Sequence, residues 1–131
     1  MIKTDVLIIG AGIGGLSTAI RIAEERPDLQ ITVLTKTNRG ESNTRYAQGG
    51  VAAVWDFGID SFNKHIEDTL DAGDGLCNLE AVEVVVKEGP DRVRELIDWG
   101  ARFDKNKSEA YDLGREGGHS ENRILHFKDL T

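Results

Sequence analysis

Residues 6–15 of the chain read Val-Leu-Ile-Ile-Gly-Ala-Gly-Ile-Gly-Gly. The unbroken run of β-branched and leucine residues predicts a buried strand over residues 5–9, which ends at the first glycine. From Gly12 to about Glu25, apolar side chains recur at helical spacing and predict a helix. A second apolar run predicts a strand over residues 30–36. Together these segments form a β-α-β unit of the usual size.

The glycines Gly10, Gly12 and Gly15 have the spacing G-x-G-x-x-G between the strand and the helix, as a dinucleotide-binding turn requires. Gly10 permits the tight turn, Gly12 lets a pyrophosphate approach the backbone, and Gly15 lets the helix pack closely on the strand. The helix N-terminus adds N–H groups and a partial positive charge. We therefore predict a pyrophosphate site here. The alternative is a glycine-rich turn that binds no ligand.

The acidic residue that usually binds the ribose hydroxyls of a dinucleotide is missing. It is expected about 20 residues after the turn, but the second strand ends Leu34-Thr-Lys36-Thr. A lysine at this position can instead contact a phosphate or an acceptor on the adenine side. Binding of free NAD through the usual acid is therefore less well supported, and NADP is not excluded by this position.

A second glycine-rich segment spans residues 42–53 and reads Ser-Asn-Thr-Arg-Tyr-Ala-Gln-Gly-Gly-Val-Ala-Ala. Gly49 and Gly50 would let a planar ring lie against the backbone. Thr44 and Gln48 would supply a hydroxyl and an amide to the polar edge of a flavin. From the residues alone, a bulge in a strand explains the segment equally well.

The remaining elements are shorter or less regular. We predict a short helix over 44–48, a strand over 51–55, helices over 61–72, 79–88 and from Pro90 to Gly100, and a short strand over 123–126, with Ser61 and Asn78 as N-caps. Only two strands are clear, whereas a doubly wound domain has about six. We expect an α/β fold with an incomplete sheet, the N-terminal part of a longer enzyme. A complete small domain is the alternative.

Composition excludes several classes of function. The chain of 131 residues has a net charge of −7, which disfavours nucleic acid and anionic membranes as partners. It has one cysteine, Cys77, no signal peptide, and no run of about 20 apolar residues, so we expect a cytoplasmic protein. No histidine spacing predicts a metal site. Ser17 and Ser42 have no nearby base that would indicate acyl transfer.

The chain resembles the L-aspartate oxidases, a flavoenzyme family related to the succinate dehydrogenase and fumarate reductase flavoproteins. The resemblance is carried by residues 5–10, 42–50, 65–70, 72–77, 115–120 and 123–126. It implies that residues 1–131 are the N-terminal part of a Rossmann-like FAD-binding domain. The capping domain and the remainder of the FAD domain would then lie outside this chain.

The resemblance also implies which residues contact FAD. Matched by position, and with the glycines of the first motif, these are Gly10, Ala11, Gly12, Ile13, Gly14, Gly15, Lys36, Asn43, Thr44, Arg45, Tyr46, Ala47, Gln48, Gly49 and Gly50. Lysine at position 36 is the residue of the family. Succinate dehydrogenases have a histidine, bonded covalently to FAD, where this chain has Asn43. Because asparagine cannot form that bond, we expect noncovalent FAD.

A substrate-facing candidate is the stretch Arg115-Glu-Gly-Gly-His-Ser120. L-Aspartate differs from succinate by an ammonium group, which a carboxylate in a desolvated site would recognise. Glu116 matches the family position that orients the substrate, and succinate dehydrogenases lack this acid. Without the resemblance, Glu116 reads as a surface residue beside a turn. Two interpretations of His119 remain: it contacts a ligand, or it contacts nearby backbone groups. We interpret His65 and His126 as surface or structural residues.

The resemblance implies FAD-dependent oxidation of L-aspartate to iminoaspartate, on the route to quinolinate and NAD, with reduced flavin reoxidised by oxygen or fumarate. The catalytic arginine of the family has no match here, so the chain by itself is expected to be inactive. One alternative is a fumarate reductase or succinate dehydrogenase flavoprotein, which Asn43 and Glu116 disfavour. Another is a non-catalytic fragment that binds dinucleotide weakly or not at all, as we expect of the chain if it ends at Thr131. Exposed strand edges would favour self-association of such a fragment.

Overall fold

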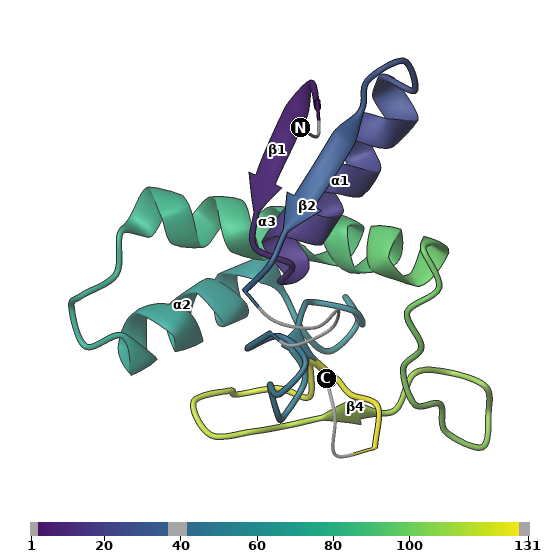
Figure 1. Cartoon of the computed structure of the whole chain (residues 1–131). Helices are drawn as coiled ribbons and strands as arrows, with labels where there is room; N and C mark the ends of the chain where they lie inside the picture. The colour runs from purple at the N-terminus through teal and green to yellow at the C-terminus, as the bar shows by residue number, and fades with distance from the viewer. Residues whose placement is uncertain (1–2, 37–41, 129–131) are drawn as a thin grey trace. The chain divides into compact units, whose positions relative to one another are not determined.

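The computed structural model describes residues 3–36 and 42–128, and the chain divides into two compact units, Met1–Ala47 and Gln48–Thr131. The first unit contains β1 (Val6–Ile9), α1 (Ile13–Glu25) and β2 (Ile31–Leu34). The second contains β3 (Val51–Ala52), α2 (Phe62–Ala72), α3 (Leu79–Asp98), β4 (Leu113–Gly114) and β5 (Ile124–Leu125) (Figure 1). None of the described helices is long and apolar enough to cross a membrane.

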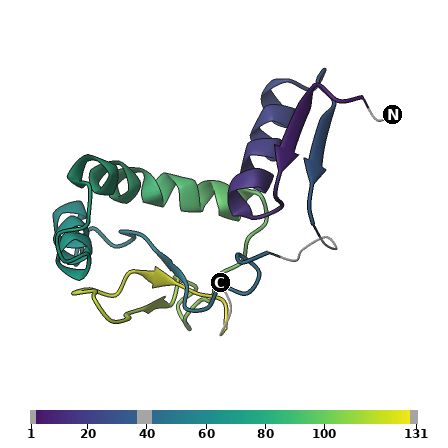
Figure 2. The same ribbon diagram turned by 60° about the vertical axis from the view of Figure 1, so that its left-hand side comes forward.

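The first unit is the predicted β-α-β unit. Strands β1 and β2 are parallel, with Val6 opposite Ile31 and Ile9 opposite Leu34. Helix α1 lies against one face of the pair (Figure 2). A Cβ added at Gly15 would overlap the carbonyl oxygen of Gly10 and lie 3.3 Å from a methyl group of Ile8. The helix therefore packs closely on the strand because residue 15 has no side chain.

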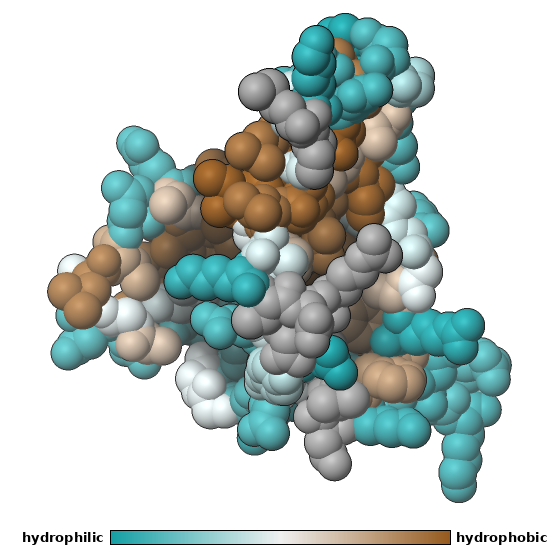
Figure 3. Space-filling view, viewed as in Figure 1, coloured by the Kyte–Doolittle hydropathy of each residue, from teal (hydrophilic) through white to brown (hydrophobic). Residues whose placement is uncertain are grey.

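Apolar side chains on β1 and β2 remain exposed. Leu7 is 52% exposed, Ile9 80% and Leu34 54%, and hydrophobic atoms gather over these strands in Figure 3. Parallel strands are normally covered on both faces. This two-stranded sheet is therefore incomplete in the chain, as the sequence predicts. That the missing part belongs to a longer polypeptide stays a prediction.

The second unit is built around a small antiparallel sheet of strand order β3-β5-β4. Its core is formed by Ala53, Val93 and Leu125. Helix α2 packs against α3, and both predicted N-caps are confirmed. The Ser61 hydroxyl accepts a hydrogen bond from the Lys64 amide at 3.2 Å, and the Asn78 side chain accepts one from the Ala81 amide at 2.9 Å.

The prediction of separate helices over 79–88 and from Pro90 is wrong, because α3 runs through Pro90. A proline inside a helix costs about 3 kcal/mol, since it lacks an N–H group and crowds the preceding turn. Val86, Pro90 and Val93 are all buried on one face of α3. Full burial of a valine contributes about 1.5 to 3 kcal/mol. Two such side chains offset the proline, so packing prevails over the local preference.

The other differences concern short segments. The short helix predicted over 44–48 is wrong: residues 43–46 form a turn, and residues 47–48 have no regular structure. The Arg45 amide donates to the Ser42 carbonyl, and the Ala47 amide donates to the Thr44 carbonyl. The strand predicted over 51–55 extends only through Ala52, because its partner β5 has two residues. The strand predicted over 123–126 is likewise limited to β5.

We predict that Gly15→Ala destabilises the chain by about 2 kcal/mol, because the new Cβ must push α1 away from the Gly10 carbonyl. Gly14→Ala is the matched control: a Cβ there meets no atom of the described residues within 4 Å, so the helix should gain up to about 1 kcal/mol from the better helix former. Urea unfolding followed by circular dichroism measures both changes. Equal stability of the two variants would contradict this account of Gly15.

Candidate functional site

The two sequence motifs of the first unit meet around one cavity. The cavity has a volume of about 700 Å³ and is lined by Ile9, Gly10, Ala11, Gly12, Leu34, Thr35, Lys36, Ser42, Asn43 and Thr44. Six of the predicted cofactor-binding residues therefore share one space: Gly10, Ala11, Gly12, Lys36, Asn43 and Thr44. The cavity lies at the carboxyl ends of β1 and β2 and the N-terminus of α1, where doubly wound proteins bind nucleotides.

The glycines of the turn serve different purposes. Gly10 has φ +109°, a conformation that strongly favours glycine. Gly12 has no positive φ, and no atom of the described residues lies closer than 3.5 Å to an added Cβ. Contacts among the described residues therefore do not explain glycine at position 12, which lines the cavity. A side chain there would occupy the cavity, so the absent Cβ suits a ligand against the backbone, as the pyrophosphate of FAD would be.

Thr44 connects the second motif to the first. Its hydroxyl accepts a hydrogen bond from the Ile13 amide at 3.2 Å, in the first turn of α1. The amides of this turn have no partner within the helix. The other predicted cofactor-binding residues of this unit lie close by in the chain. Gly14 and Gly15 belong to the first turn of α1, and residues 45–47 directly follow Thr44. The sequence predicted both motifs but not this hydrogen bond between them.

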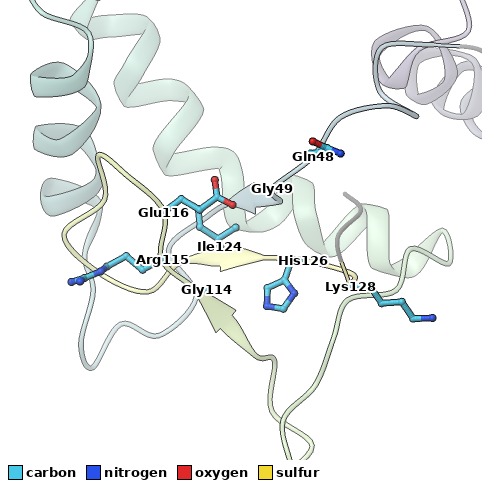
Figure 4. Close-up of a pocket in the computed structure, with 8 residues that line it drawn as sticks. All are labelled: Gln48, Gly49, Gly114, Arg115, Glu116, Ile124, His126 and Lys128. Carbon is cyan, nitrogen blue, oxygen red and sulfur yellow. The ribbon is translucent and has the colours of Figure 1, made fainter.

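In the second unit, Glu116 lies beside Gly49. Both line a cavity of about 460 Å³, together with Gln48, Gly114, Arg115, Ile124, His126 and Lys128. Figure 4 shows the Glu116 carboxylate directed toward Gly49, while Arg115 and Lys128 point away from it. A Cβ added at Gly49, where φ is +104°, would lie 2.9 Å from the Glu116 Oε1 atom. The predicted substrate-orienting acid is thus next to the predicted flavin segment.

Gly50 has a structural explanation of its own. An added Cβ would lie 2.5 Å from the Ile124 Cγ2 atom and 2.5 Å from the Leu125 carbonyl oxygen. Close pairing of β3 with β5 therefore accounts for this glycine without any ligand. Gly49 is different, because the atoms nearest to its added Cβ belong to the Glu116 carboxylate.

Glu116 is exposed, and no cation pairs with it in the part of the chain that the structure describes. Of the basic residues that line the same cavity, Arg115 and Lys128 point away from Glu116 in Figure 4, and the His126 Nδ1 atom lies 3.4 Å from Asp104. The carboxylate is therefore available to a ligand cation. The desolvation that we expect at this site is not provided by the described residues.

A buried ion cluster that the sequence did not reveal lies next to the Glu116 loop. The Arg123 side chain is fully buried, and its Nε and Nη2 atoms each donate to Asp60 at 2.8 Å. Its Nη1 atom donates to Asp68 in α2. The sequence shows an ordinary arginine before a short strand, and no local pattern indicates pairing with residues so far along the chain.

The cluster shifts the pKa values of its members. Burial raises the pKa of Asp68, but the Ser120 amide, the Arg123 guanidinium and the Ser120 hydroxyl outweigh it and lower the pKa from 3.8 to about 2. The pKa of Asp60 is also lowered, because hydrogen bonds from Arg123 and the Ser61 amide outweigh burial. Both groups therefore stay ionised in the folded protein at neutral pH.

Two histidines adjoin this cluster. His119 Nδ1 lies 3.2 Å from Arg123 Nη1, and because a guanidinium can only donate, Nδ1 is the acceptor. The His65 ring is 5.7 Å from the His119 ring. Burial, followed by the charge of Arg123, lowers the pKa of His65. His65 is buried, and its Nδ1 atom has no hydrogen-bond partner among the described residues. His119 contacts Arg123, which neither of the two sequence interpretations of His119 anticipated.

We predict that acid removes the stabilisation provided by Asp68. Because its pKa is lowered on folding, the folded state binds fewer protons than the unfolded chain. The stabilisation is thus complete above about pH 4 and is lost as the pH falls toward 2. The free energy of unfolding of Asp68→Asn should fall below that of the parent by about 1 to 2 kcal/mol at pH 6, with a smaller gap at pH 2.5. Urea titrations at both pH values measure the gap. A gap independent of pH would disprove the assignment.

Three comparisons place the chain among known proteins. L-aspartate oxidase of Yersinia pestis is 51% identical over 132 residues, covering 98% of this chain and 24% of that protein. The chloroplastic L-aspartate oxidase 2-b of Nicotiana tabacum is 48% identical, covering 97% and 19%. The structure of Mycobacterium smegmatis Sdh1 in complex with UQ1 superimposes with a TM-score of 0.88 at 38% identity, covering 98% and 21%.

The resemblance to L-aspartate oxidases is therefore confirmed, and the chain spans a quarter or less of the length of these curated relatives. The α/β fold predicted for part of an FAD-binding domain is also confirmed. Residues 5–130 match the family described as FAD binding domain. The chain belongs to the FAD binding domain family.

Proposed function

We propose that this chain is the nucleotide-binding part of an FAD-dependent L-aspartate oxidase. The observation that carries the proposal is the Glu116 carboxylate, which lies against Gly49 without a cation paired to it among the described residues. Identity to the Yersinia pestis oxidase, at 51%, exceeds identity to the Sdh1 structure, at 38%. Both observations favour the oxidase over a succinate dehydrogenase or fumarate reductase flavoprotein.

In this proposal the first unit holds the nucleotide end of FAD. Gly10, Ala11 and Gly12 would face the pyrophosphate, with the N-terminal amides of α1 close by. Lys36, exposed at the rim of the same cavity, would replace the usual acidic residue as a partner for phosphate or adenine. Asn43 lines the cavity as well, and because it cannot bond covalently to a flavin, the cofactor would be bound noncovalently.

The second unit would contribute to the substrate side. FAD, when bound, supplies the two-electron acceptor for amino-acid oxidation. Glu116 would bind the ammonium group of L-aspartate and so orient the substrate. The loss of that contact with succinate would give the site its preference. Oxygen or fumarate would serve as the final acceptor. The cytoplasmic location and self-association stay predictions.

The first test is to add FAD to the purified natural polypeptide that contains this chain, remove the excess by gel filtration and record the absorption spectrum. We expect retained flavin absorbance, and acid precipitation should release the flavin into the supernatant because the attachment is noncovalent. Gly12→Val should abolish retention, since its side chain would occupy the cavity. Flavin that stays in the acid pellet would contradict noncovalent binding. Equal retention by Gly12→Val would contradict the proposed cradle.

The second test addresses the substrate and uses the natural polypeptide that contains this chain, loaded with FAD. We predict that Glu116→Gln raises the KM for L-aspartate by about 10- to 100-fold, the usual range for one lost polar contact. The Kd for succinate, which lacks the ammonium group, should change less than about threefold. Steady-state kinetics and flavin absorbance titration give the two constants.

The matched control is Glu109→Gln, which removes the same charge from a carboxylate that is 87% exposed. It should leave both constants unchanged. An enzyme that oxidises succinate and ignores L-aspartate would instead support the succinate dehydrogenase or fumarate reductase alternative.

A further inference from the structure

The loop that carries Glu116 is held by one carboxylate oxygen. Residues 115–123 connect β4 to β5, and the Oδ2 atom of Asp68 accepts hydrogen bonds from the Ser120 amide at 2.8 Å and the Ser120 hydroxyl at 2.9 Å. The same oxygen accepts the hydrogen bond from Arg123 at the end of the loop. Asp68 therefore fixes the returning half of the loop at two successive points.

A further hydrogen bond links this part of the loop to Glu116. The His119 amide donates to the Glu116 carbonyl oxygen at 3.2 Å, and Gly118 has φ +84°. A positive φ at the third residue is typical of a type II turn. Because His119 and Ser120 are adjacent, this turn joins Ser120, bound by Asp68, directly to the backbone of Glu116.

One face of α2 contacts the second half of the loop, residues 118–121. Lys64 pairs with Glu121 at 2.6 Å, Asp68 binds Ser120, and Ala72 Cβ would lie 3.6 Å from a Cβ added at Gly118. Lys64, Asp68 and Ala72 follow one another at intervals of four residues, so they share a face of the helix. In Figures 1 and 2 the loop runs beside α2.

We propose that Asp68 is a positioning residue for Glu116: by fixing Ser120 and Arg123 it sets the place of the Glu116 carboxylate beside Gly49, and through it the recognition of the substrate ammonium group. This inference rests on the proposed function of Glu116. Asp68 itself touches neither substrate nor cofactor in this account. Loss of one partner of a buried ion pair also destabilises the fold, so the test of Asp68 needs readouts that a loss of stability alone would not change.

Asp60 provides a matched control. It binds the same Arg123 guanidinium through two hydrogen bonds, and its other hydrogen bond, from the Ser61 amide at 2.7 Å, lies outside the loop. Asp60→Asn and Asp68→Asn therefore both take one carboxylate from Arg123. Only Asp68→Asn also removes a charged acceptor from Ser120.

The experiment uses the natural FAD-loaded polypeptide and four variants: Asp68→Asn, Asp60→Asn, Glu116→Gln and the double variant Asp68→Asn/Glu116→Gln. We expect Asp68→Asn to raise the KM for L-aspartate about tenfold, because a misplacement near 1 Å can cost up to about 100-fold. The Kd for succinate and the FAD content should stay within about threefold of the parent. Asp60→Asn should raise the KM for L-aspartate less than Asp68→Asn does, because it leaves both hydrogen bonds of Ser120 to Asp68 in place.

The double variant decides between positioning and general stability. If Asp68 acts through Glu116, it should have no further effect on the KM for L-aspartate once Glu116 is replaced. Amide hydrogen exchange of the peptide 115–122, measured by mass spectrometry, should be faster in Asp68→Asn than in Asp60→Asn. An equal rise of the KM for L-aspartate and the Kd for succinate, or full additivity in the double variant, would overturn the inference.

Two further outcomes are distinguishable. If Glu116→Gln leaves the KM for L-aspartate unchanged, the proposed role of Glu116 fails, and the positioning role fails with it. If Asp68→Asn does not retain FAD, Ser120→Ala replaces it, since this variant removes only the hydroxyl bond at 2.9 Å. Ser120→Ala should raise the KM for L-aspartate about threefold, and only while Glu116 is present. An unchanged KM would overturn the inference.

Discussion

The arrangement of the second unit depends on the ion pairs of the buried Arg123 guanidinium. It joins Asp60, just before α2, and Asp68, within α2, to the start of β5. Replacing such a cluster by apolar side chains often costs little, but removal of one partner leaves a buried charge and costs about 3 to 5 kcal/mol. The cluster therefore contributes mainly a defined geometry. Its contacts join α2, β5 and the loop between β4 and β5.

That arrangement separates residues that the fold explains from residues that it does not. Glycine at position 15 is explained by contact between helix and strand, and glycine at position 50 by contact between β3 and β5. Gly12 has no such explanation and lines a cavity. Among the charged groups described in and beside the loop, Glu121 and Arg123 have ionic partners, whereas Arg115 and Glu116 have none, and of these two only Glu116 is directed toward Gly49. Gly12 and Glu116 are the residues of this kind that we assign to ligands.

Sequence patterns predicted the local features well and the distant contacts poorly. The β-α-β unit and the caps at Ser61 and Asn78 depend on neighbours within a few residues, and all were predicted. The helix boundary predicted at Pro90 is wrong because burial of one face of α3 outweighs the local preference of proline. Only the packed structure reveals that burial. The pairing of Arg123 with Asp60 and Asp68 links residues far apart in the chain, and one sequence contains no signal for it.

The resemblance to L-aspartate oxidases identified Glu116 as the substrate-orienting residue. Its electrostatics explain why its residue type and position alone do not indicate this role. Two unit charges 4 Å apart in water interact by about 1 kcal/mol, roughly a factor of five in affinity, whereas near a protein surface of effective dielectric constant 20 the energy is about 4 kcal/mol. Glu116 is exposed in this chain. An exposed carboxylate beside a glycine turn discriminates weakly between L-aspartate and succinate. Strong recognition of the ammonium group therefore requires both a fixed carboxylate, which the loop on α2 provides, and exclusion of water, which the described residues do not.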